Sequence, residues 1–406
     1  MQINQEGTVT SPAGFTAAAT AAGLKGSDQL DLALVYSEQN CVTAAMFTQN
    51  QVAAAPVNVD RETLAMDNRI IRAVVVNAKN ANACTGQPGI ENARRMQYVA
   101  ANALTCKPEQ VLVLSTGVIG VQMPMGKIEA GINAAAQHLS PENGRAAAAA
   151  IMTTDTIPKH LSVSLDLPAG PVTIGGMAKG AGMIHPNMAT MLAVVTTDAA
   201  VDSVVLQEML ETAVNQSFNR ISIDGDTSTN DTILLLANGA GGVSLTDAAG
   251  QAQFGNALNY LCRELAQMIV RDGEGATKFV EIQVTGARSD AEAHQIANTI
   301  ATSPLVKTAF AGSDPNWGRI LAAAGRAGVP LDQYKMNLWI GVNQPDELQL
   351  VANGTPTDYA EADAAAVFAQ DAFKIRLDLR LGAGNTAVWT SDLTHAYITI
   401  NADYRS

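Results

Sequence analysis

The segment 179–192 holds residue types that could do chemistry. It reads Lys-Gly-Ala-Gly-Met-Ile-His-Pro-Asn-Met-Ala-Thr-Met-Leu, and the apolar run continues to residue 195. Thr190 would therefore stand at the start of a buried strand, where its hydroxyl is a candidate nucleophile. If the chain were cut between Ala189 and Thr190, Thr190 would also carry a free α-amine with a pKa of about 8, a base beside its own nucleophile. On pattern alone, a glycine turn followed by an ordinary strand is the commoner interpretation.

The same segment resembles, without a departure, the signature of the ornithine acetyltransferase (glutamate N-acetyltransferase) family, K-G-[SA]-G-M-I-x-P-N-M-A-T-M-L. Members of that family cleave themselves between the alanine and threonine of this signature. The resemblance implies that Ala189 and Thr190 flank a cleavage site and that Thr190 is the nucleophile. It covers essentially the whole chain, and further matching segments are 7–15, 47–50, 54–57, 80–86, 272–278, 313–319 and 401–406. One departure is Ala78-Lys79, where a small Ser-Gly pair is expected; it concerns the local turn and not the chemistry.

Thr116 and Gly117 resemble the family's oxyanion hole. They follow the apolar run 111–115, and a threonine hydroxyl and a glycine N–H can both donate to one developing oxyanion. Glycine also lets a substrate approach the backbone closely. Without the resemblance, an ordinary turn at the end of a strand is the commoner interpretation of this pair.

The resemblance also implies a set of substrate-binding residues, carried over position by position. Lys179 would meet the carboxylate of an amino-acid substrate, and Glu274 would pair with its cationic end or move protons. An exposed carboxylate at a helix end is the alternative for Glu274. Family members often end in threonine where this chain ends in Ser406, which keeps the hydroxyl. The full expected set is Thr153, Lys179, Thr190, Glu274, Asn401 and Ser406.

The resemblance implies a ping-pong reaction in which Thr190 takes acetyl from N2-acetylornithine, releases ornithine and passes the acetyl group to glutamate. Some family members also use acetyl-CoA as the donor, and we expect such a bifunctional enzyme of arginine biosynthesis. We expect acetyl-CoA to be a substrate at most, with no cofactor. One alternative is an N-terminal-nucleophile aminopeptidase or amidohydrolase that passes the acyl group to water. Another is an uncleaved protein that senses a metabolite.

Composition excludes several other classes. The 406 residues carry a formal net charge of −13, which argues against a nucleic-acid binder. The four cysteines and five histidines are dispersed, so we expect neither disulfides nor a metal site. No apolar run approaches the ~20 residues of a membrane span, and the start lacks a signal-peptide pattern, so we expect a cytoplasmic protein.

Several elements must position these residues. Runs typical of strands include 30–36, 71–77, 110–114, 161–167, 190–196, 232–237, 280–285, 374–381 and 396–400. Helical periodicity marks 90–104, 127–139, 206–219, 257–271, 291–301 and 360–372. Because strands and helices do not alternate one for one, we expect a mixed α/β sandwich. The family resemblance implies the same: helices packed on central sheets in a DmpA/ornithine-acetyltransferase-like fold, with the nucleophile on a central strand. Cleavage would give an alpha chain, 1–189, and a beta chain, 190–406, which share sheets; two of each would form a heterotetramer.

Two other segments partly resemble loops that bind phosphate or calcium. Segment 120–127 resembles a phosphate-binding loop but has one residue too many and continues with Ile128, so it does not predict a nucleotide site. Asp224, Asp226 and Asp231 flank a polar segment without the spacing of a calcium loop. We interpret that segment as a turn lining the site.

Overall fold

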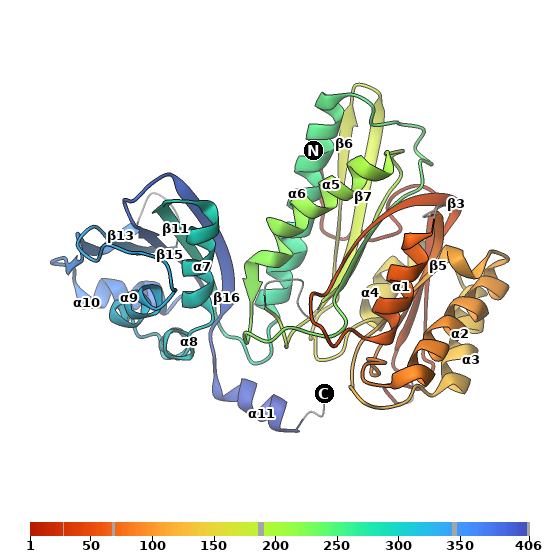
Figure 1. The fold of residues 1–406 in the computed structure, drawn as a ribbon, viewed down its shortest axis with the longest axis horizontal. Coiled ribbons are helices and arrows are strands. Elements are labelled where there is room, and N and C mark those ends of the chain that lie inside the picture. Colours follow the sequence, from red (N-terminus) through yellow and green to blue (C-terminus); the bar gives the residue numbers. More distant parts are fainter. Residues whose placement is uncertain (27, 67–69, 186–190, 343–346, 404–406) are drawn as a thin grey trace.

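Two β-sheets, of nine and seven strands, organise the computed structural model over the residues it describes, which are 1–26, 28–66, 70–185, 191–342 and 347–403 (Figure 1). The larger sheet has the order β1-β6-β7-β8-β10-β3-β4-β5, and β2 also pairs with β3. Its strands are β1 (Gln2–Asn4), β2 (Phe15–Thr20), β3 (Leu32–Phe47), β4 (Ile70–Asn77), β5 (Val111–Ser115), β6 (Lys159–Leu167), β7 (Gly170–Lys179), β8 (Leu192–Thr197) and β10 (Thr232–Ala237).

The larger sheet folds into two halves because β3 runs through both. β3 pairs with β2 and β4 near its start and with β10 near its end, and its register with β4 shifts between Tyr36 and Cys41. Apolar side chains from both halves meet in one core, for example Val76 of β4 and Val194 of β8. β-Branched and aliphatic residues dominate these strands, as expected for strands covered on both faces.

Helices cover the outer faces of both halves. α6 (Ala248–Arg271) packs on β6 and β7 beside α5 (Ser203–Asn215), and α2 (Gly86–Leu104) and α3 (Met125–Ala136) cover the half built by β3, β4 and β5. The apolar residues of α6 recur every three or four positions and are buried, which produces one packed face. The layers thus run helix, sheet, sheet, helix, and the predicted mixed α/β sandwich is confirmed. Shorter helices in this part are α1 (Ala55–Ala65) and α4 (Gly144–Ala150).

The smaller sheet has the order β14-β13-β12-β15-β11-β16-β9 and its own core. Phe310, Phe368 and Phe373 meet there with ring centroids 4.6–6.0 Å apart. The strands are β9 (Ile221–Ser222), β11 (Phe279–Ala287), β12 (Asn337–Gly341), β13 (Glu347–Ala352), β14 (Thr355–Pro356), β15 (Ala372–Asp378) and β16 (Gly384–Ser391). The helices that accompany them are α7 (Asp290–Ala301), α8 (Pro304–Ala311), α9 (Trp317–Gly325) and α10 (Glu361–Phe368).

The two fragments expected from cleavage are interleaved in the larger sheet. β8 pairs with β7 on one side and with β10 on the other, and β10 pairs in turn with β3. β7 and β3 belong to residues 1–189, whereas β8 and β10 belong to residues 190–406. The expectation that both fragments supply strands to a shared sheet therefore agrees with the structure. The Ala189–Thr190 bond itself lies outside the described residues.

The strand expected at 396–400 is wrong, because the structure has a helix there, α11 (His395–Asp403). The alternation of Tyr397, Thr399 and two isoleucines favours a strand locally. No neighbouring strand is paired with this segment in the described part of the chain, so tertiary context decides the conformation. α11 buries none of its residues and extends from the end of β16 toward the larger sheet (Figure 1). It carries Tyr397 and Asn401, four positions apart, on one face.

Candidate active site

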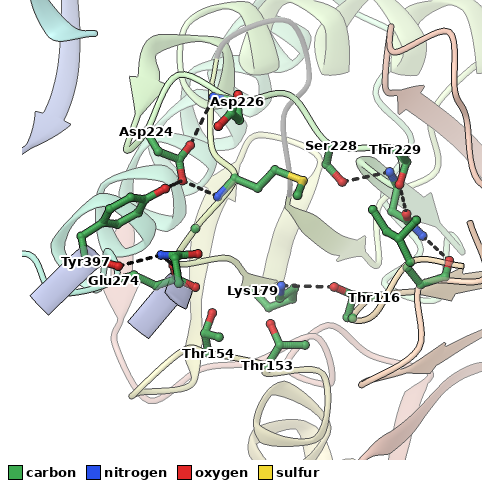
Figure 2. A pocket seen from close by; sticks show the side chains of 17 residues that line it. Thr116, Thr153, Thr154, Lys179, Asp224, Asp226, Ser228, Thr229, Glu274 and Tyr397 are labelled. Carbon is green, nitrogen blue, oxygen red and sulfur yellow. Dashed lines mark hydrogen bonds between the residues drawn. The ribbon is translucent and has the colours of Figure 1, made fainter. Parts of the chain in front are cut away.

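A cavity of about 210 Å³ lies where β5 and β7 end and where the loop before β10 passes (Figure 2). That volume suits a ligand smaller than the drug-sized molecules bound by clefts of roughly 300–1,000 Å³. All the expected site residues that the structure describes line it, although they come from five separate segments. They are Thr116, Gly117, Thr153, Lys179, Glu274 and Asn401.

Gly117 occupies a position that only glycine can fill. Its φ is +132°, and a Cβ there would come within 2.2–2.5 Å of backbone atoms of Lys79. Lys79 itself has a φ of +68°, a left-handed conformation that glycine adopts more readily. This left-handed turn explains why a small residue is expected at position 79, where the chain has lysine. The N–H of Gly117 has no hydrogen-bond partner among the described residues and remains a free donor at the cavity.

Thr116 and Lys179 are hydrogen-bonded in the cavity wall. The Lys179 ammonium donates to Thr116 Oγ1 at 3.2 Å, so the threonine hydroxyl can direct its own proton to another acceptor. The Lys179 side chain is buried, and burial lowers its pKa, whereas the negative charges of Asp155, Asp231 and Glu274 oppose this shift. An ammonium group has three donors, so Lys179 can donate to a substrate anion in the cavity as well as to Thr116.

Glu274 forms the opposite side of the cavity. Its Oε2 accepts a hydrogen bond from Asn401 Nδ2 at 2.7 Å, and a Cβ at Gly182 would lie only 2.4–2.6 Å from its carboxylate. Tyr397, one turn earlier on α11, donates its hydroxyl to Asp224 Oδ2 at 3.2 Å. Through these two contacts the last described helix closes one side of the cavity (Figure 2).

Asp224 is a half-buried carboxyl group that binds the glycine-rich loop after β7. It accepts the N–H groups of Met183 and Ile184 at 2.5 and 2.9 Å. Burial raises the pKa of this carboxyl group, although those N–H donors and the Tyr397 hydroxyl act in the opposite direction. Asp224, Asp226 and the segment 228–230 all line the cavity, which agrees with their interpretation as a turn beside the site.

A buried ion network supports the segment that carries Thr153. Lys159 Nζ donates to Asp155 Oδ1 at 2.7 Å and to Asp272 Oδ2 at 2.5 Å, and its side chain is fully buried. Asp155 also accepts the N–H groups of Thr153 and Gly180 at 3.0 and 2.7 Å. Asp272 lies two residues before Glu274 and ends α6. The network thus joins three segments that meet at the cavity.

Three of the expected site residues, Ala189, Thr190 and Ser406, lie outside the described residues. Met191, which directly follows Thr190 in the sequence, is described and is buried. It lines a small cavity together with Thr116 and Lys179. The residue next to the expected cleavage site is therefore close to the expected oxyanion hole.

Sequence reasoning missed several residues of the site. Tyr397 was missed because the sequence predicts a strand for its segment. A helix would have placed Tyr397 on the same face as Asn401. Lys159 was missed because its pairing with Asp272 joins positions 113 residues apart. Asp272 lies in the matching segment 272–278, but the segment alone did not indicate this partner. Thr154 adjoins Thr153 and also lines the cavity. Across the described ranges, no group of three or more His, Cys, Asp or Glu side chains is arranged to hold a metal ion.

The fold and the cavity define a class: a two-sheet α/β protein with a small, charged site for a small molecule. The chain belongs to the ArgJ family, whose model matches residues 16–406, and the family expected from the sequence is confirmed. It is 47% identical to the "Arginine biosynthesis bifunctional protein ArgJ" of Symbiobacterium thermophilum over 98% of this chain and 99% of the relative. The Synechocystis protein of the same name is 45% identical, with 98% of each covered.

Two solved structures are also similar in sequence. The argJ protein of Bacillus halodurans shares 42% identity, covers 52% of this chain and 97% of its own, and has a TM-score of 0.49. The ornithine acetyltransferase of Mycobacterium tuberculosis, solved with ornithine, shares 40% identity over 46% of this chain and 97% of its own, with a TM-score of 0.43. Among the described helices, none has the length and apolar character needed to cross a membrane.

Proposed function

We propose that this chain is a glutamate N-acetyltransferase that moves acetyl from N2-acetylornithine to glutamate. The observation that carries the proposal is the single cavity lined by six residues expected to bind substrate or stabilise charge. Family membership and the names of the relatives support arginine biosynthesis over an aminopeptidase. The enzyme first cleaves itself between Ala189 and Thr190.

Each turnover passes through an acetyl-threonine. The Thr190 hydroxyl attacks the acetyl carbonyl of acetylornithine, the C–N bond breaks, and ornithine leaves with the proton. The α-amine of glutamate then attacks the ester, forms N-acetylglutamate and restores the hydroxyl. A covalent intermediate splits one difficult transfer into two matched steps. In turnover, the freed α-amine of Thr190 is the nearest base to its own hydroxyl, acting through a water molecule.

Thr116 and Gly117 would stabilise the oxyanion of both tetrahedral intermediates. Since Thr116 Oγ1 accepts from Lys179, its own O–H is available to donate, and the nearby cation strengthens it as a donor. The N–H of Gly117 supplies a second donor without a partner in the described part of the chain. Two such donors are the arrangement that acyl transfer needs.

The charges of the cavity match an amino acid with a second amine. Lys179 offers a cation for the α-carboxylate, and Glu274 and Asp226 lie on the other side of the cavity (Figure 2). Those carboxylates suit the cationic end of ornithine. Acetyl-CoA is a second donor substrate in this proposal, and no cofactor takes part. The processed chains assemble as two alpha and two beta chains in the cytoplasm.

The test is to incubate the purified protein with N2-acetylornithine and to measure ornithine, acetate and, after glutamate is added, N-acetylglutamate. We expect one equivalent of ornithine without glutamate and continuous, equimolar ornithine and N-acetylglutamate with it. Thr190→Ala should abolish both products and leave one uncut chain by intact mass.

Continuous release of acetate would instead support the amidohydrolase alternative. Ligand binding by an uncut wild-type chain without turnover would support a metabolite sensor. Replacing acetylornithine with acetyl-CoA tests the second donor.

A further inference from the structure

Asp231 is a fully buried carboxyl group with one unused oxygen. It immediately precedes β10 and is 0% exposed. Its Oδ1 accepts the N–H of Met191 at 2.9 Å, while Oδ2 is buried and has no partner among the described residues. A buried carboxylate oxygen without a hydrogen bond is costly to keep, so its retention calls for an explanation.

The register of the sheet fixes Asp231 beside Met191, the first described residue after the expected cleavage site. β10 runs parallel to β8 with Thr232 opposite Leu192. Asp231 accepts the N–H of Met191, and the N–H of Thr232 donates to the Met191 carbonyl oxygen at 3.2 Å. The peptide groups on both sides of Met191 are therefore held by two consecutive residues, Asp231 just before β10 and Thr232 at its start. Met191 follows Thr190 directly in the chain.

The surroundings of Asp231 contain one other charged group in the described part of the chain. The small cavity at Asp231 is lined by Thr116, Lys179, Met191, Leu192, Ser228 and Asn230. Of these, Lys179 alone carries a charge, and it favours the ionised form of Asp231. Burial has the larger effect and raises the pKa of Asp231 well above its ordinary value. Such a carboxylate is a stronger base near neutral pH than an exposed one.

Self-cleavage poses a problem that turnover does not. Before the bond is cut, the nitrogen of Thr190 is an amide and cannot accept a proton, so the α-amine expected to serve as base in turnover does not yet exist. Another group must take the hydroxyl proton. Lys179 is an ammonium donor to Thr116 and is unsuited to that role while it is charged.

We propose that Asp231 transfers the proton in the self-cleavage of this chain before Thr190, an inference that rests on the function proposed above. Its carboxylate accepts the Thr190 hydroxyl proton as the Thr190 oxygen bonds to the Ala189 carbonyl carbon. The same proton passes to the Thr190 nitrogen as the C–N bond breaks, which leaves an ester and a free amine. Water then hydrolyses the ester, giving the Ala189 carboxylate and the Thr190 hydroxyl. Asp231 is again an ionised carboxylate once the proton has passed to the Thr190 nitrogen.

The experiment follows cleavage of freshly synthesised full-length precursor by intact mass between pH 5 and 9. The variant Asp231→Asn keeps an oxygen for the Met191 N–H but cannot take up a proton. We expect cleavage at least 100-fold slower than in wild type. The wild-type rate should rise with pH and then level off, whereas the residual rate of Asp231→Asn should lose that dependence.

Asp60→Asn is the matched control. Asp60 is also buried and accepts a backbone N–H, that of Val113, at 2.9 Å, but it lies on α1 and does not line either cavity at the site. We expect it to cleave within threefold of wild type. If Asp231→Asn cleaved equally fast with the wild-type pH profile, Asp231 would only hold Met191 and the inference would be wrong.

A second variant guards against a folding defect. If Asp231→Asn lacks the circular dichroism of wild type, the test uses Asp231→Glu instead, because glutamate keeps a carboxylic acid. Slow cleavage by Asp231→Glu with a displaced pH profile would support proton transfer by Asp231. If the pH profile of cleavage is unchanged in Asp231→Glu, or is flat in wild type, the proposed proton transfer is wrong. A wild-type chain that never cleaves would instead overturn the proposed self-processing, so the two failures are distinguishable.

Discussion

Asn401 Nδ2 donates a hydrogen bond of 2.7 Å to Glu274 Oε2, and this contact joins the last described helix to the loop between α6 and β11. The two residues are 127 positions apart in the chain. Because Glu274 also lies against Gly182, the contact fixes a carboxylate where three segments meet. Its orientation depends on a side chain only five residues from the chain's last residue.

Asn401→Ala should therefore weaken substrate binding more than chemistry. A hydrogen bond to a charged group contributes about 1.5–3 kcal/mol when buried, and Asn401 is exposed, so we expect a rise of about tenfold in KM for acetylornithine with kcat within threefold. Steady-state kinetics checks this. Asn133→Ala, an exposed position on α3, is the matched control. A loss confined to kcat would contradict a binding role.

Thr116→Val should lower kcat by about 100- to 1,000-fold, the usual effect of removing one oxyanion donor. Valine keeps the shape of threonine, so the midpoint of thermal unfolding should change little. The measurement is single-turnover release of ornithine, with the unfolding midpoint taken on the same sample. Thr16→Val in β2 is the control, because Thr16 lies outside the cavity. An unchanged rate of acetyl transfer would exclude the hydroxyl from the oxyanion hole.

Lys159→Met should destabilise the fold by about 3–5 kcal/mol, because it leaves Asp155 and Asp272 buried without their cation. Urea unfolding measures the change on uncut chains that also carry Thr190→Ala, because a single chain can refold reversibly. The control is Lys335→Met, whose ion pair with Asp332 is exposed at 3.5 Å and should contribute less than about 1 kcal/mol. Equal effects of the two substitutions would show that the buried network does not stabilise the fold.

Lys307 should make stability depend on pH. Burial lowers the pKa of its ammonium group to about 7, although Asp392 and Asp224 oppose the shift; its ordinary value is 10.5. Between these values the unfolded chain binds the extra proton, so the free energy of unfolding should rise with pH from about 7 to 10.5, by at most about 1.4 kcal/mol per pH unit.

The measurement is urea unfolding at several pH values for two uncut chains, Thr190→Ala alone and Thr190→Ala with Lys307→Met. The variant should lack the part of the rise that comes from this side chain, which donates to Thr390 Oγ1 at 2.9 Å. Identical pH dependence in both proteins would show that Lys307 stays charged in the fold.

The resemblance to family motifs predicted much of this candidate site, and local patterns predicted where some of its residues lie. Thr116 and Gly117 could be placed at the end of a strand from the apolar run before them, and the strand was found at Val111–Ser115. Tyr397 could not be found, because local β-propensity gave the wrong conformation for its segment and only tertiary contacts give α11 its position. Lys159 was equally hidden, since nothing near it in the chain indicates a partner 113 residues away.

The interleaving of β8 and β10 between strands of the first half has a consequence for refolding. An uncut chain that unfolds can return to its structure as one molecule, at a rate independent of concentration. Once the bond before Thr190 is cut, β7 and β3 must recapture β8 and β10 from a separate polypeptide, so recovery becomes a second-order encounter. Dilution then opposes recovery. Maturation would thus replace reversible unfolding with a fold that, once lost in a dilute solution, is slow to return.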